Sequence, residues 1–189
     1  GNTVNIGNVT VANNVTATIT GTAAGTYATG GAVRTINVGS GGLFDFQGQA
    51  ISTAAGTGFV KSGDGIFALG GAAYTGGFTL NAGTVVIRGS NALGSGGVLT
   101  INGGTIGASA TRDMSSRYSN IVVGGDFTIG SSTSPSVGTS NLTFSNTMAL
   151  GTSSSRTITI GGTGTYTLGG VISGSSSNLT VAATAAGVI

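Results

Sequence analysis

A three-residue pattern, apolar–Thr–apolar, recurs along the whole chain between glycine-containing turns. It occupies residues 9–11, 78–80, 99–101, 127–129, 142–144, 158–160, 166–168 and 179–181. In a β-strand successive side chains point to opposite faces, so each pattern buries two apolar groups and turns one hydroxyl outward. Threonine suits this place because it favours extended backbone. No segment shows the i, i+3, i+4, i+7 spacing of an amphipathic helix, so the sequence predicts an all-β chain.

These short apolar runs come in pairs, and the pairs recur at a regular step. The first members begin at residues 35, 59, 78, 98, 121, 142 and 157. The mean step of about 20 residues is the mark of a repeat architecture. Two strands and two connections of that length fit one coil of a solenoid, and parallel crossovers are right-handed. We therefore expect a right-handed parallel β-helix, a β-solenoid with about 20 residues per coil and about nine coils.

A sandwich of antiparallel hairpins is the alternative for many short strands joined by glycine turns. Tight hairpins prefer Asn-Gly or Asp-Gly at the turn. Only Asn102-Gly103 and Asp64-Gly65 match strictly. A regular step also has no reason to exist in a sandwich, so the solenoid is favoured.

The chain is expected to form one domain with a distinct N-terminal segment. Residues 1–30 are strand-rich and run into a loose Ala/Thr/Gly stretch, which indicates a first coil and a half, a cap or an exchange arm. Residues 31–189 are expected to form the solenoid. Residues 109–120, with two arginines and a tyrosine, predict a loop that bulges from the rod. Residues 131–140 contain the one proline and predict a second loop.

Residues 59–106 carry a specific set of motifs. They are Lys61-x-Gly63-x-Gly65, Tyr74-Thr75-Gly76-Gly77, Asn81-Ala82-Gly83-Thr84 and Asn91-Ala92-Leu93-Gly94. This stretch closely resembles the autotransporter-associated β-strand repeat of bacterial autotransporter passenger domains. Residues 165–181 resemble the approach to another such repeat, but the Lys-x-Gly-x-Gly motif does not follow. The resemblance implies a right-handed β-helix located outside the cell or on a bacterial surface.

Charged side chains are scarce, which bears on the partners of the chain. Six basic and four acidic residues make up 5% of the sequence and leave a net charge of +2. The closest basic pair is Arg112 and Arg117, with Asp113 between them. Nucleic-acid or membrane-surface binding needs clustered basic residues, so neither is expected. No stretch approaches the roughly 18 consecutive apolar residues of a membrane span.

Catalytic chemistry has few candidate groups in this sequence. There is no Glu, His or Cys, so a serine or threonine nucleophile lacks its usual base. Glycoside hydrolysis needs two carboxylates, and only Asp45 and Asp64 lie about one coil apart. Asp64 stands in a Gly-x-Gly turn, where Asp is a common turn former. Lys61 is expected to be a solvated charge beside Asp64. We therefore predict no enzyme, catalytic residue, metal site or cofactor, with a polysaccharide-active β-helix as a remote alternative.

Asparagine spacing predicts side-chain ladders along the rod. Asn81 and Asn102 lie about one coil apart in the sequence, and so do Asn120 and Asn141. Amides in adjacent coils can stack in hydrogen-bonded rows.

Two functions agree with these features. The first is an extracellular, non-catalytic stalk or adhesin scaffold that displays loops to a host surface or a polysaccharide. The second is a filament subunit that self-associates end to end, since open strand edges recruit other strands unless charge or proline blocks them. Residues 1–19 carry no charged side chain, and the sequence ends on Val188-Ile189. Contacts of this head-to-tail kind produce filaments.

Overall fold

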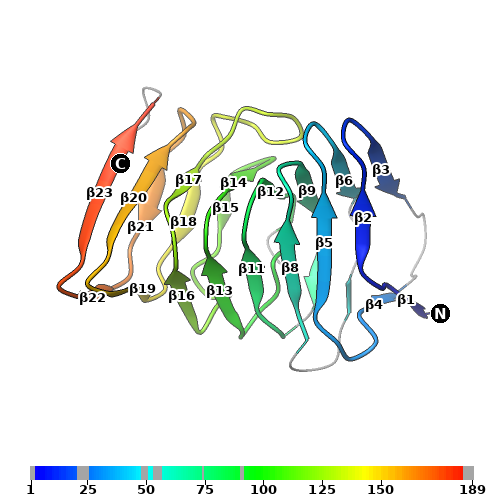
Figure 1. Cartoon of the computed structure of the whole chain (residues 1–189), viewed down its shortest axis with the longest axis horizontal. Helices are drawn as coiled ribbons and strands as arrows, with labels where there is room; N and C mark the ends of the chain where they lie inside the picture. The colour runs from blue at the N-terminus through cyan, green and yellow to red at the C-terminus, as the bar shows by residue number, and fades with distance from the viewer. Residues whose placement is uncertain are drawn as a thin grey trace.

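A computed structural model describes residues 3–20, 26–47, 51–52, 57–73, 75–89 and 92–184. Within these ranges the chain forms 23 strands and no helix. Every strand pair among them is parallel, and pairs join strands of successive turns. The prediction of an all-β, parallel β-solenoid is confirmed, and the antiparallel sandwich is wrong. In Figure 1 the strands stack along the longest axis, and the two termini lie at opposite ends of it.

Two long walls run the length of the rod, and each contains eight parallel strands. Sheet B consists of β2 (Val9–Val11), β5 (Arg34–Val38), β8 (Phe59–Ser62), β11 (Phe78–Leu80), β13 (Val98–Ile101), β16 (Asn120–Val123), β19 (Met148–Thr152) and β22 (Ile172–Ser175). Sheet C consists of β3 (Thr16–Ile19), β6 (Leu43–Phe46), β9 (Ile66–Leu69), β12 (Thr84–Ile87), β14 (Thr105–Ala108), β17 (Phe127–Ile129), β20 (Ser155–Ile160) and β23 (Asn178–Ala183).

A third wall closes the coil in two sections. Sheet A contains β1 (Thr3–Asn5), β4 (Thr26–Ala28), β7 (Ile51–Ser52) and β10 (Ala72–Ala73), and sheet D contains β15 (Arg112–Asp113), β18 (Leu142–Phe144) and β21 (Tyr166–Leu168). Each of these strands precedes a strand of sheet B or follows one of sheet C, so both sections lie on the same side of the coil. The described residues between β12 and β13 form no strand, and the third wall is interrupted there.

The spacing between stacked residues is longer and less regular than the sequence predicts. The shortest step joins Ile66 to Thr84 and the longest joins Phe127 to Ile158, with a typical value of about 23. Eight strands in each of sheets B and C also replace the nine coils expected. The third wall is the reason, because its strands take up residues in most coils, and two of them, β18 and β21, carry the same apolar–Thr–apolar pattern as strands of the other walls. A coil was expected to begin at residue 142, but β18 belongs to sheet D and the next strand, β19, to sheet B.

The core is a column of inward side chains stacked turn upon turn. Phe44, Phe46, Phe59, Phe67 and Phe78 form an aromatic section near its N-terminal half. Phe44 stacks on Phe67 with ring centroids 5.6 Å apart, and it meets Phe46 edge-on at 5.2 Å. Aliphatic side chains continue the column through the later turns. Stacking therefore buries a continuous core that no single coil could bury alone.

The N-terminal residues 3–19 form the first turn of the stack. β1 lies on β4, β2 on β5 and β3 on β6, all in parallel register. They belong to residues 1–30, for which the sequence indicates a first coil and a half, a cap or an exchange arm.

Residues 109–120 do not bulge from the rod, so that expectation is wrong. β15 pairs with β18 in the third wall, and the side chains of Met114 and Tyr118 are buried in the core. Residues 131–140 do form a loop, and it folds back on sheet C. The Val137 amide donates to the Ala108 carbonyl at 2.7 Å, and the Gly138 carbonyl accepts from the Thr163 amide at 2.7 Å. This loop covers Gly107 on the outer face of sheet C.

Candidate functional site: the open ends of the solenoid

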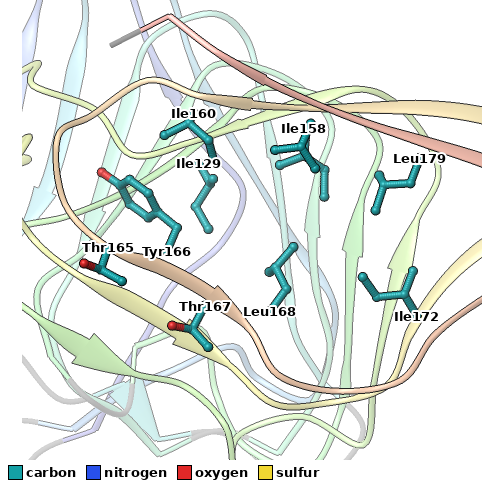
Figure 2. A pocket seen from close by; sticks show the side chains of 10 residues that line it. Ile129, Ile158, Ile160, Thr165, Tyr166, Thr167, Leu168, Ile172 and Leu179 are labelled. Carbon is teal, nitrogen blue, oxygen red and sulfur yellow. The ribbon is translucent and has the colours of Figure 1, made fainter. Parts of the chain in front are cut away.

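The last turn of the rod encloses an apolar cavity of about 450 Å³. Its walls are the inward side chains of β17 and β20–β23, mostly Ile, Leu and Val, as Figure 2 shows. The lining consists of Ile129, Ile158, Ile160, Thr165, Tyr166, Thr167, Leu168, Ile172, Leu179 and Val181. Elsewhere in the stack, the inward side chains of one turn are covered by those of the next. No described residue performs this role for the last turn.

Apolar side chains at this end are open to solvent. Val171, Ile172 and Val181 are 69%, 39% and 40% exposed, and Ile172 and Val181 line the cavity. β21, β22 and β23 are also the last strands of sheets D, B and C. Their outer edges have no partner strand among the described residues, so the C-terminal face combines bare strand edges with a hollow apolar interior.

The first turn of the rod also has strand edges and apolar side chains that are not covered by described residues. β1, β2 and β3 are the first strands of sheets A, B and C. Val4 and Val15 are 53% and 46% exposed, and Ile19 is only partly buried. The sequence carries no charged side chain before Arg34 and none after Arg156. Both end turns are therefore apolar and free of charged side chains.

Lys61 is buried in the core, so the prediction of a solvated charge is wrong. Its side chain has no exposed surface, and in sheet B it lies in register between Ile36 and Leu80. The ammonium group donates to the carbonyls of Ser62 at 2.7 Å, Gly63 at 2.6 Å and Ala82 at 3.2 Å. Desolvation lowers the pKa of this amine to about 8, against the opposing attraction of Asp64. The amine thus joins the turns of two adjacent coils.

The alternation along β8 could have revealed this position. Phe59 points inward and Val60 outward, so the next residue points inward again. The glycines of Lys61-x-Gly63-x-Gly65 indicated a coil corner instead, and a lysine at a corner was expected to face solvent. The carbonyls that accept from the amine belong to turns, and the conformation of these turns cannot be inferred from the spacing of residues in the sequence.

Asp45 and Arg88 form an ion pair on the outer face of sheet C. The Arg88 guanidinium donates to an Asp45 carboxylate oxygen at 2.7 Å, with the aspartate side chain 4% exposed and the arginine 27%. Asp45, Ala68 and Val86 occupy one row, and all three are buried. Arg88 therefore reaches across the β9 coil to the coil of β6. The second carboxylate oxygen of Asp45 and Nε of Arg88 are buried without a partner.

Asp45 and Asp64 are not brought together. Asp45 lies in register with Ala68, whereas Asp64 is exposed in the turn between β8 and β9. The coil at this point is longer than the sequence distance between the two aspartates, so they do not stack. The structure therefore assembles no pair of carboxylates from these two residues.

The basic residues of 112–117 mainly make internal contacts. A terminal guanidinium nitrogen of Arg112 donates to the Arg88 carbonyl. Asp113 accepts hydrogen bonds from the Ser115 hydroxyl and from the Ser115 amide at 2.9 Å. These bonds, with the charge of Arg117, lower the pKa of the Asp113 carboxyl. Burial raises the pKa of Tyr118, whose hydroxyl has no partner.

One of the two predicted asparagine ladders is confirmed. The Asn102 amide donates to the Asn81 side-chain oxygen at 2.9 Å. The Asn120–Asn141 ladder is wrong, because Asn120 lies in sheet B and Asn141 precedes β18 in sheet D.

Side chains that accept a backbone amide from the next turn were not predicted. Asn8 accepts from Thr35 at 3.0 Å, Asp126 from Thr157 at 2.8 Å and Asn141 from Thr165 at 2.8 Å. The sequence separations of these pairs are longer than the predicted coil, which concealed the contacts.

Within the described part of the chain, no three potential metal-ligating side chains gather. The same residues include no helix that could cross a membrane. Comparison with protein-family models, with curated proteins and with solved structures finds no match to this chain.

Proposed function

We propose that this chain is a non-catalytic structural protein, a β-solenoid that acts as a stalk or adhesin scaffold outside a bacterial cell. The observation that carries the proposal is the pair of unbroken eight-strand walls around one continuous core. With neighbouring strands about 4.8 Å apart, eight turns give a rod about 38 Å long. Such a rod holds its outer surfaces at a fixed distance from an attachment point.

The build of the rod suits this role. Each turn contacts mainly its neighbours, so the stability of the rod is roughly a sum of local terms and its length can vary. Buried cross-turn contacts add to the backbone pairing. Lys61 ties two coils through carbonyls, and Arg88 reaches Asp45 across a third. These contacts resist separation of turns along the axis.

The proposed location at a bacterial surface depends on the motifs of residues 59–106. Their resemblance to the autotransporter-associated repeat supports an extracellular or cell-surface location. Within the structure these residues form β8 to β13 and the start of β14, at the middle of the rod. The motif residues Lys61 and Gly63 supply the buried amine and one of its carbonyls.

The partners we propose are a host surface or a polysaccharide, reached through the outer walls. The outer face of sheet B carries the stacked pair Thr79 and Thr100, and the stacked pair Asn81 and Asn102 directly follows the same two strands. Hydroxyl and amide groups can hydrogen-bond to sugar hydroxyls without a strong charge. Nucleic acid is not a partner in this proposal, because the arginines at 112 and 117 are not a displayed basic patch.

The test is a glycan-array binding assay run beside a reducing-end assay on the same polysaccharides. We expect retention on some glycans or host-cell extracts without release of new reducing ends. Thr79→Ala with Thr100→Ala should weaken retention while the circular dichroism spectrum is unchanged. Release of new reducing ends from any polysaccharide would replace the scaffold with an enzyme.

The second candidate is a filament subunit that self-associates end to end. It is favoured by the apolar end turns without charged side chains and by the hollow last turn. This candidate extends the scaffold, since a filament is a longer rod of the same build.

A further inference from the structure

We propose that the corner between sheets B and C, at the turns after β8 and β11, is a binding site for one monovalent cation of the size of ammonium or potassium. In this chain the tethered ammonium group of Lys61 occupies the site. With that amine removed, the same corner takes up a free ion from solution. The inference rests on neither the stalk nor the filament, because it concerns the interior of the rod.

The three oxygen atoms that accept from the amine are backbone carbonyls, and they converge from two coils. Ser62 ends β8 and Gly63 follows it, whereas Ala82 lies in the turn between β11 and β12. Their oxygens lie 2.7, 2.6 and 3.2 Å from the Lys61 nitrogen. Converging backbone carbonyls replace the hydration shell of potassium ions in selective sites. The corner therefore offers a cation the same kind of shell.

Two glycines keep this shell open. Gly63 and Gly83 have φ values of 70° and 71°, a left-handed conformation that glycine adopts without strain. A Cβ at Gly83 would overlap the carbonyl oxygens of Gly63 and Gly65, and it would lie 2.7 Å from the Lys61 nitrogen. A side chain at position 83 would therefore compete with the cation for the same space.

The charge around the site suits one unit of positive charge. The three accepting oxygens belong to neutral amides, whereas protein sites for Ca²⁺ and Mg²⁺ are built with carboxylates. Burial lowers the pKa of the Lys61 amine, and the charge of the nearby Asp64 carboxylate raises it. Asp64 is exposed, so it compensates the buried charge through space and does not enter the shell. A divalent ion would lack the negative charge that its loss of water requires.

The stem of Lys61 reaches this corner through the apolar core. Lys61 is fully buried and lies in register between Ile36 and Leu80 on sheet B. Its methylene groups therefore occupy an inward row of apolar side chains, and its nitrogen meets the carbonyls. A methionine side chain is as long as lysine without the nitrogen. Lys61→Met thus keeps most of the packing and leaves the place of the nitrogen to a free ion.

The experiment compares urea unfolding of the full Lys61→Met chain at neutral pH in the chlorides of potassium, ammonium and tetramethylammonium at equal concentration. The first two cations fit a shell of this size, whereas tetramethylammonium is larger and has no N–H group. An ion that binds only the folded chain stabilises it by an amount that grows with the ratio of ion concentration to Kd. We expect potassium and ammonium to lower the unfolding equilibrium constant at least about 10-fold relative to tetramethylammonium.

Two chains are the controls for general effects of the salts. The unaltered chain should unfold alike in the potassium, ammonium and tetramethylammonium salts, since the Lys61 amine already fills the site. Leu80→Met is the matched variant, because Leu80 lies in the same inward row one coil later. It changes the core by a similar amount and leaves the Lys61 amine among its carbonyls. Its response to the three salts should equal that of the unaltered chain.

Equal unfolding of Lys61→Met in the three salts would overturn the inference, and so would a preference for potassium and ammonium that Leu80→Met shares. A Lys61→Met chain that is unfolded in tetramethylammonium chloride is expected to fold in the other two salts, as measured by circular dichroism. Lys61→Ala, which leaves more space for a hydrated ion, repeats this measurement. Failure of both variants to fold in potassium and in ammonium chloride would also rule out the site.

Discussion

Lys61 is the one lysine of the chain, and its amine is held among three backbone carbonyls inside the rod. Hydrogen bonds to the charged form favour it, whereas loss of water opposes it. The net result is a pKa lowered from 10.5 to about 8. The folded chain therefore releases this proton at a lower pH than the unfolded chain does, which makes stability depend on pH.

Between about pH 8 and pH 10.5 the unfolded chain binds more protons at this site, so the contribution of Lys61 to stability rises with pH. Relative to Lys61→Leu, which removes the titrating group, the unaltered chain should gain up to about 3 kcal/mol across this window. Urea unfolding of both chains at intervals of pH measures the gain. Subtracting the variant cancels the tyrosine titrations. Parallel stability curves for the two chains would contradict the prediction.

Glycines at the corner that leads into sheet B permit close contact between successive backbones. A Cβ added at Gly76 would overlap the carbonyl of Thr57, and one at Gly97 would overlap the carbonyl of Gly76. The first glycine of the Tyr-Thr-Gly-Gly motif therefore has a steric basis. The sequence shows these glycines, but it does not show which of the 38 glycines lie this close to another backbone.

We expect Gly76→Ala to lower the unfolding free energy by more than about 2 kcal/mol, because backbone would have to move. Gly71→Ala is the matched control. No atom lies within 4 Å of a Cβ built at Gly71, and its φ is not positive. That variant should unfold within about 0.5 kcal/mol of the unaltered chain. Equal losses for the two variants in urea unfolding would rule out the close contact as the cause.

At the scale of elements, the outer face of sheet C shows a contact that joins three coils. Arg88 follows β12, passes the small side chain of Ala68 and pairs with Asp45 on β6. Removal of one partner leaves a buried charge without compensation, which is costly. Replacement of both partners by apolar groups avoids that cost.

Arg88→Met should therefore destabilise the rod by about 3 kcal/mol. Asp45→Ala combined with Arg88→Met should recover most of that loss, since alanine already fills the neighbouring position of this row at Ala68. A double-mutant cycle by thermal or urea unfolding measures the coupling. Arg156→Met serves as the control, because Arg156 bonds only backbone carbonyls. Additive losses for Asp45 and Arg88 would show that the pair is not coupled.

Alternation and turn composition predicted most strands of sheets B and C, since one residue in two is apolar there. They could not assign strands to walls. β18 and β19 carry similar patterns, yet one lies in sheet D and the other in sheet B. β15, only two residues long with Arg112 and Asp113, has no strand pattern at all. Its place in the wall depends on pairing with β18, a strand of the next turn that is distant in the sequence.

For the whole molecule, regular spacing predicted the solenoid correctly because stacking requires each turn to repeat. The exact period was not accessible, since the turns differ widely in length without changing the walls. The cavity in the last turn was not predicted either. It arises from the absence of a covering turn among the described residues rather than from any motif.

A rod with uncovered end turns should open from its ends. Amides of β22 and β23 should exchange with deuterium at least about 100-fold faster than those of β11 and β13 in the middle of the rod, because an end turn is held from one side only. Exchange mass spectrometry checks this order. Uniform exchange along the monomer would contradict it.

The longest step in the stack lies between Phe127 and Ile158, and the walls on either side of it keep their register. The additional residues leave and re-enter the coil at one corner, where 131–140 rests on sheet C. Residues can therefore be inserted at that corner without a change in the strands of the rest of the chain. A foreign epitope inserted near the exposed Val137 would be displayed on a rod whose walls are unchanged.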